Sequence, residues 1–108
     1  MALINVIVKE PGKPAQFRKI PDRLEGFWDT IGGYFEAYRV LDDVYLLVDE
    51  LGRTKGLPFN CNLCGVDWCG PIILVKSSAD DFVNIQPGEE ASFRRVFARL
   101  FKGEEVNT

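Results

Sequence analysis

The sequence predicts one α+β domain spanning residues 1–108, built on a single mixed or antiparallel sheet with two helices packed on it. Three observations predict this class. Short runs of β-branched and aromatic residues recur along the chain, two segments carry apolar residues at helical spacing, and no internal repeat or low-complexity segment competes. Together they predict the order ββαββ-loop-βα. A chain of 108 residues leaves little room for a second core.

Two strands are predicted near the N-terminus. Residues 3–8 form an almost unbroken apolar run, which is typical of a central strand buried on both faces. Pro11–Gly12 ends that run and indicates a turn. Residues 16–20 are mixed in polarity, so we expect an edge strand that pairs back in a hairpin.

The first helix is predicted from Asp22 to Ile31. Asp22 and Glu25 have the spacing of a capping box. The apolar residues that follow recur at i, i+3, i+4 and i+7: Leu24, Phe27, Trp28 and Ile31. Gly32–Gly33 is predicted to end the helix, because a phosphate-binding glycine loop would precede a helix and have a different spacing.

The second half of the chain alternates strands with less regular segments. Further strands are predicted at residues 34–41, 44–48 and 72–75, with a shorter one at 82–85. Asp42–Asp43 forms a break short enough for a hairpin turn. A final helix is expected from Glu89 to Lys102, and residues 104–108 are expected to fray.

The charge and composition exclude several classes of protein. The net charge is −3 with both signs interspersed, which argues against nucleic-acid binding through a broadly basic surface. A local basic face remains on the final helix: Arg94, Arg95, Arg99 and Lys102. No apolar run is long enough to cross a membrane and no secretory signal is evident, so we expect a cytoplasmic protein. The absence of histidine excludes catalysis by histidine and metal sites that contain histidine.

Three cysteines lie close together in a glycine-rich segment. Cys61, Cys64 and Cys69 form a CxxCxxxxC pattern whose first pair has the spacing of a zinc knuckle. A fourth ligand is missing unless Asp67 or a second chain supplies it. Buried or unmodified thiols are the alternative, and we expect no stoichiometric metal and no cofactor.

The longest stretch predicted to be irregular runs from Glu50 to Gly70, and we expect ligand or partner binding in its part from Lys55 to Cys69. Phe59 and Asn60 follow a Gly-Leu-Pro turn and would present an aromatic ring beside an amide. The alternative is that Phe59 fills the core. Lys55, Phe59, Asn60 and Trp68 are the candidate binding residues, and other aromatic residues could line the same pocket: Trp28, Tyr34, Tyr38 and Tyr45.

Four segments resemble a family known from phages and other mobile elements of gut bacteria. They are Ile31-Gly32-Gly33-Tyr34-Phe35-Glu36, Asp49-Glu50-Leu51-Gly52, Gly56-Leu57-Pro58-Phe59-Asn60 and Gly70-Pro71-Ile72-Ile73-Leu74-Val75. The family they resemble is domain of unknown function family 3846. The resemblance implies a genomic setting in a bacterial host, without a chemistry. The cysteine segment is not part of the pattern.

Two classes of function follow. The first is a non-enzymatic binding protein that sequesters a small, nucleotide-like ligand or masks a host protein, with a role in counter-defence or host modulation. The second is a small metal-binding or nucleic-acid-binding module, or a hydrolase without a recognisable motif. We favour the first because the sequence shows no nucleophile elbow, phosphate loop or separated pair of carboxylates. Association with a second copy of the chain stays open.

Overall fold

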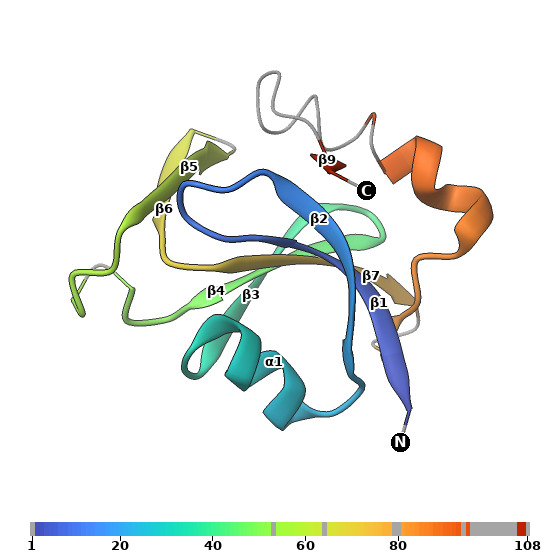
Figure 1. Ribbon diagram of the computed structural model, residues 1–108, viewed down its shortest axis with the longest axis horizontal. Helices are drawn as coiled ribbons and strands as arrows, with labels where there is room; N and C mark the ends of the chain where they lie inside the picture. Colours follow the sequence, from blue (N-terminus) through green and yellow to red (C-terminus); the bar gives the residue numbers. More distant parts are fainter. Residues whose placement is uncertain are drawn as a thin grey trace.

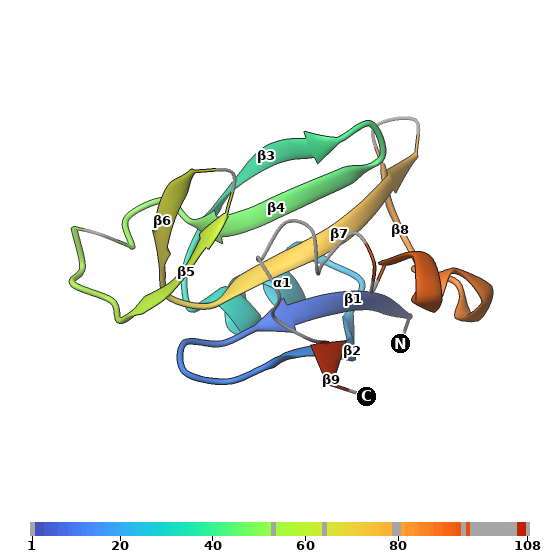
Figure 2. The ribbon, with the colours of Figure 1, turned by 90° about the horizontal axis from the view of Figure 1, so that it is seen from above.

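The computed structural model describes residues 2–52, 54–63, 65–78, 81–93, 95 and 106–107. The largest element of the fold is one seven-stranded sheet, ordered β3-β4-β7-β1-β2-β9, with β8 also paired to β7 (Figure 2). A separate hairpin, β5-β6, lies beside the sheet (Figure 1). The elements are β1 (Leu3–Lys9), β2 (Ala15–Pro21), α1 (Leu24–Ile31), β3 (Phe35–Leu41), β4 (Val44–Asp49), β5 (Phe59–Leu63), β6 (Val66–Cys69), β7 (Ile72–Ser78), β8 (Asp81–Val83), the 3-10 helix η1 (Pro87–Glu89) and β9 (Val106–Asn107).

The predicted α+β class with two helices on a sheet is wrong, because the fold is predominantly antiparallel β-structure. Only α1 is an α-helix of two turns or more within the described residues. Residues 90–93 and 95 are helical, and the rest of the helix predicted from Glu89 to Lys102 lies outside the described residues. The fold contains more strand than predicted because a segment predicted to be a loop forms β5 and β6.

The centre of the sheet follows the apolar runs of the sequence. β1 pairs with β2 on one side and with β7 on the other, which confirms its predicted central position. β7 also pairs with β4, and its first four residues are buried. Strands that are covered on both faces need apolar side chains in both directions, and β1 and β7 provide them.

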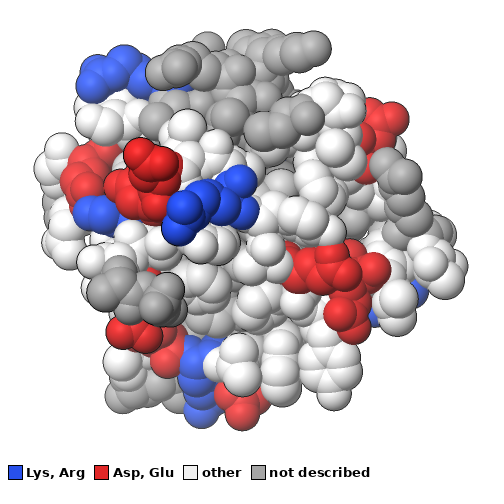
Figure 3. Space-filling model, turned by 180° about the vertical axis from the view of Figure 1, so that it is seen from behind, with Lys and Arg blue, Asp and Glu red and all other residues white. Residues whose placement is uncertain are grey.

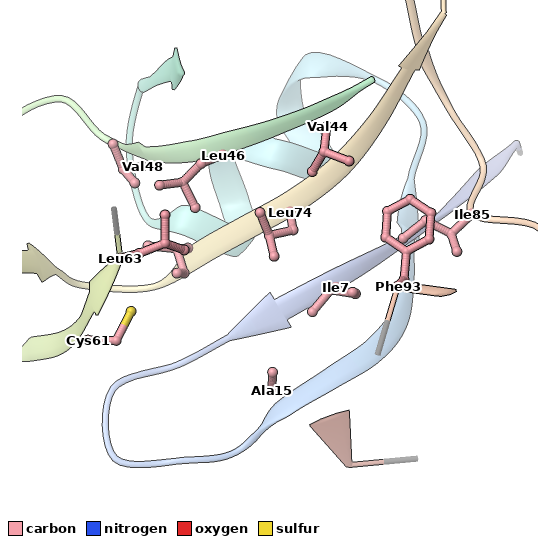
Figure 4. Packing of buried hydrophobic residues seen from close by; sticks show 11 residues of the cluster. Ile7, Ala15, Val44, Leu46, Val48, Cys61, Leu63, Leu74, Ile85 and Phe93 are labelled. Carbon is pink, nitrogen blue, oxygen red and sulfur yellow. The ribbon is translucent and has the colours of Figure 1, made fainter. Parts of the chain in front are cut away.

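The two faces of the sheet carry separate hydrophobic clusters. α1 covers one face, where Phe27 and Ile31 pack against residues of β1, β4 and β7 (Figure 1). The hairpin and the segment around Phe93 cover the other face. Figure 4 shows that Cys61 and Leu63 lie at one end of this second cluster, whereas Ile85 and Phe93 lie at the other end.

Helix α1 begins later than predicted and without the predicted cap. Arg23 is its N-cap residue and no side chain caps the helix, so the capping box expected from Asp22 and Glu25 is absent. The predicted C-terminal stop is confirmed. Gly32 adopts a left-handed conformation (φ 90°), and its N–H donates to the Trp28 carbonyl at 2.7 Å.

Two segments predicted to lack regular structure contain strands. β5 and β6 form an antiparallel hairpin with a bulge at Asn60, and Gly65 supplies a positive φ of 78° at its turn. In the tail predicted to fray, Val106 pairs with Ala15 as β9 joins β2 in parallel. Neither segment shows clean apolar alternation, because the hairpin is bulged and β9 is only two residues long.

An ion pair is among the contacts that tie the segment after β8 to the sheet. Lys76 of β7 donates to Glu89 of η1 at 2.6 Å, and Glu89 also accepts from the Gln86 N–H at 3.0 Å. These two interactions lower the pKa of Glu89 below its ordinary value.

None of the helices in the described part of the chain has the length and apolarity needed to cross a membrane.

Candidate ligand-binding site

A pocket of about 490 Å³ lies between the edge of the sheet and the β5-β6 hairpin. Three segments that are distant in sequence line it. They are β3 with Glu36 and Tyr38, the end of β4 and the following turn with Val48, Asp49, Glu50, Gly52 and Thr54, and β6 with Val66, Asp67, Trp68 and Cys69. Figure 2 shows how β6 lies next to the start of β3 and the end of β4.

Two aromatic rings that pack against each other form part of the pocket wall. The rings of Tyr38 and Trp68 lie 5.3 Å apart, and they are tilted at 49° to each other. Trp68 is fixed by its indole N–H, which donates to the Leu63 carbonyl at 3.1 Å. Tyr38 is 42% exposed and is fixed by its hydroxyl, which donates to the carboxylate of Glu36. Both rings are therefore oriented by hydrogen bonds that leave ring surface available.

The hydrogen bond to Glu36 also changes the acidity of Tyr38. Together with partial burial and the negative charge of Glu36, it raises the pKa of Tyr38 above the ordinary value of 10.0. Tyr38 is therefore a neutral phenol at physiological pH. The phenol adds no charge of its own to the pocket.

The described charged side chains that line the pocket are acidic, and one of them, Asp49, is paired with Lys55. Glu36, Asp49, Glu50 and Asp67 line it, and none of the described lining residues is Lys or Arg. Arg53, between two lining residues in the sequence, lies outside the described residues. Figure 3 views the molecule from the β3 side and shows several groups of acidic side chains, some with Lys or Arg side chains beside them. An acidic pocket with aromatic walls suits a cation, because carboxylates and ring faces both attract positive charge.

A buried carboxylate holds the turn that forms the floor of the pocket. The side chain of Asp49 is 1% exposed, and it accepts from the Leu51 N–H and from the Lys55 ammonium, each at 2.8 Å. A Cβ at Gly33 would lie 2.7 Å from the Lys55 nitrogen and 3.0 Å from an Asp49 carboxylate oxygen, so a side chain there would displace the Lys55 ammonium from its present position. Lys55 thus positions the turn and does not line the pocket.

Asn60 has a structural role at the bulge of β5. Its side-chain nitrogen donates to the carbonyls of Lys9 and Gly70, at 2.8 and 2.7 Å. It is 6% exposed, and none of the described residues donates to its side-chain oxygen. Asn60 joins the hairpin to the end of β1, so it is not available as the ligand-binding amide that the sequence predicted.

Phe59 lies on the surface of the hairpin and does not line the pocket. Its side chain is 58% exposed, so the interpretation that it fills the core is wrong. Of the four residues predicted from the sequence, only Trp68 contributes to the pocket wall. Tyr38, which the sequence offered among several aromatic residues, lies opposite it.

The cysteines are not gathered into a metal site within the described residues. Cys61 is buried in the core cluster, Cys69 lines the pocket, and Cys64 lies outside the described residues. No group of three Cys, Asp or Glu side chains in the described part of the chain is placed to hold a metal ion. Asp67 instead accepts from the side chain of Asn62 at 2.9 Å.

Sequence reasoning missed Glu36 and Glu50 as pocket residues. Glu36 and Tyr38 are two apart on a strand, so they share a face, and that face carries the hairpin. This alternation was visible in the sequence, but the position of β6 opposite them was not.

The comparisons with known proteins agree with the resemblance read from the sequence. A profile of the family described as "Domain of unknown function (DUF3846)" matches residues 4–98. No curated protein and no solved structure shows a significant match. The four segments that carry the resemblance include Gly33, Asp49, Gly52 and Asn60, which support the pocket and its hairpin. The chain therefore belongs to the DUF3846 family, whose function is unknown.

Proposed function

We propose that this protein is a non-enzymatic binding protein that acts by occupancy, and that its pocket takes a cationic group of a partner protein. The observation that carries the proposal is the pairing of two oriented aromatic rings with carboxylates at one pocket. A Lys or Arg side chain fits this combination, because its apolar stem lies along the rings while its charge meets the carboxylates.

The charge of the pocket distinguishes between the two ligands that the sequence left open. A nucleotide carries phosphates, which the side chains of Glu36, Glu50 and Asp67 would repel. A host protein with an exposed basic segment would be attracted to the same residues. Masking of a host protein is therefore favoured over sequestering of a nucleotide-like ligand.

The cellular setting of the proposal rests on the family resemblance alone. Within a phage or another mobile element, such a protein would act in the cytoplasm of the bacterial host, for counter-defence or host modulation. Binding by occupancy requires no catalytic group, and the described residues around the pocket include no nucleophile oriented by a base.

Calorimetric titration with a peptide of alternating lysine and valine tests the proposal. We expect binding that is lost when the lysines are acetylated. In the triple variant Glu36→Gln, Glu50→Gln, Asp67→Asn, we expect the affinity to fall about tenfold, since each exposed charge contributes about 0.2–1 kcal/mol. The control is Glu25→Gln, because Glu25 is exposed on α1 and lies away from the pocket. Equal affinity of the triple variant, or tighter binding of adenosine monophosphate than of the peptide, would refute the proposal.

A further inference from the structure

We propose that the outer edge of β3 binds the partner as an added strand, an extended antiparallel segment whose basic side chains point into the acidic pocket. This inference rests on the proposed function and specifies the form of the ligand. β3 is the last strand at one end of the sheet, and within the described residues nothing pairs with its outer side (Figure 2).

The register identifies the backbone groups that β3 presents outward. The Glu50 N–H donates to the Tyr34 carbonyl, and Glu36 and Tyr38 continue this series of pairs with β4. In an antiparallel pair, alternate residues direct their N–H and C=O groups to the neighbour and the others direct them away. The outward groups therefore belong to Phe35, Ala37 and Arg39.

This edge lacks several of the features that usually protect an edge strand, and its charged residues are Glu36 and Arg39. Natural edges are interrupted by bulges, proline or lysine, or are covered by another segment. The bulge of β3 lies beyond Arg39, so the stretch from Phe35 to Arg39 is regular and contains neither proline nor lysine. At the opposite end of the sheet, β9 covers part of β2. The exposed edge of β3 is thus a preformed template for one more strand.

Charge determines which partner fits and which way it faces. Glu36 lies on the pocket face of β3 near Glu50 and Asp67, whereas Arg39 lies on the other face, with its guanidinium 5.8 Å from the ring centre of Tyr45. An added strand therefore meets negative charge on one face only. A second copy of this edge would bring its own Glu36 to the same face, so like charges disfavour it. A partner with lysine or arginine at alternate positions matches this arrangement.

The geometry also fixes which peptide amides are needed. In the antiparallel pair, residues opposite Glu36 and Tyr38 place their side chains in the pocket but direct their N–H groups away from β3. Residues opposite Ala37 direct their N–H groups to β3. In the alternating lysine and valine peptide, lysines occupy the first set of positions and valines the second. The valine amides therefore form the hydrogen bonds to β3.

Two N-methylated forms of the peptide test this arrangement by calorimetry. Methylation of the backbone nitrogens of the valines should weaken binding at least about tenfold. Methylation of the backbone nitrogens of the lysines should change the affinity by no more than about twofold. The protein variant Ala37→Pro should lose binding to the same extent, whereas Ala37→Val, which keeps the N–H, should retain it. Circular dichroism of both variants checks that they are folded.

The outcomes separate this inference from the proposed function. If the unmodified peptide binds but both methylated forms bind equally well, strand addition is refuted and the cationic pocket stands. If the unmodified peptide does not bind, both proposals fail. If light scattering shows that the protein forms a dimer that Ala37→Pro dissociates, the edge is occupied by a second copy and the inference is overturned.

Discussion

At the scale of single residues, Asn60 shows how a polar side chain can be required for the fold without contacting a ligand. Its amide joins the carbonyls of Lys9 and Gly70, which belong to distant parts of the chain. Asn60→Ala would leave both carbonyls unsatisfied in a buried place, so we expect the free energy of unfolding to fall by about 1–3 kcal/mol. Denaturant titration measures this. Asn62→Ala removes a more exposed amide of the same strand and should change the free energy of unfolding by less than about 0.5 kcal/mol. If the two variants lost equal stability, the structural role of Asn60 would be contradicted.

Tyr38 provides a second test at this scale, through its acidity. The hydrogen bond to Glu36 raises its pKa, so the folded protein holds the neutral phenol more strongly than the unfolded chain does. This contribution to stability is complete below the ordinary pKa of 10.0 and is lost as the pH rises through the folded-state value. Glu36→Gln should lower the pKa of Tyr38. Ultraviolet titration of tyrosinate, with Tyr38→Phe to identify the signal, measures the shift, and an unchanged pKa would show that Glu36 is not the cause.

At the scale of elements, Gly26 determines how closely α1 approaches β2. A Cβ at Gly26 would lie 2.2 Å from the carbonyl oxygen of Pro21. Replacing a helical glycine by alanine usually stabilises a helix by about 1 kcal/mol. Here we expect Gly26→Ala to destabilise the protein by about 1–3 kcal/mol, because the helix must move away from the strand. Gly88→Ala is the control, since nothing lies within 4 Å of its Cβ. Thermal unfolding compares the two, and a stabilised Gly26→Ala variant would contradict the packing described.

Elements with a simple apolar pattern were predictable from the sequence, and those with an irregular pattern were not. β1 and β7 were predictable because both faces of each are buried, so apolar residues run without interruption. The β5-β6 hairpin was not, because the bulge at Asn60 breaks its alternation and its strands carry Asn62 and Asp67. The start of α1 was misplaced because β2 pairs with β1 as far as Pro21 and the Asp22 N–H donates to the Ala2 carbonyl, and a local capping pattern cannot reveal these contacts.

At the scale of the whole molecule, the candidate site exists only where three distant segments meet. Trp68 could be selected from the sequence because it lies in an irregular stretch, but its partner Tyr38 lies on a strand far from it in sequence. The carboxylates come from β3, the turn after β4, and β6, so no linear motif contains them. Two of these carboxylates, Glu36 and Glu50, lie in separate family segments. These segments also contain Asp49, whose side chain holds the turn beside the pocket.

The central claim is that a basic extended segment binds between the edge of β3 and the β5-β6 hairpin. Nuclear magnetic resonance titration of the isotope-labelled protein with the alternating lysine and valine peptide tests it most directly. We expect the largest chemical-shift changes at the indole N–H of Trp68 and at the backbone amides of Phe35, Ala37 and Arg39. Changes centred on β2, or on the exposed ring of Phe59, with the Trp68 signal unmoved would contradict it.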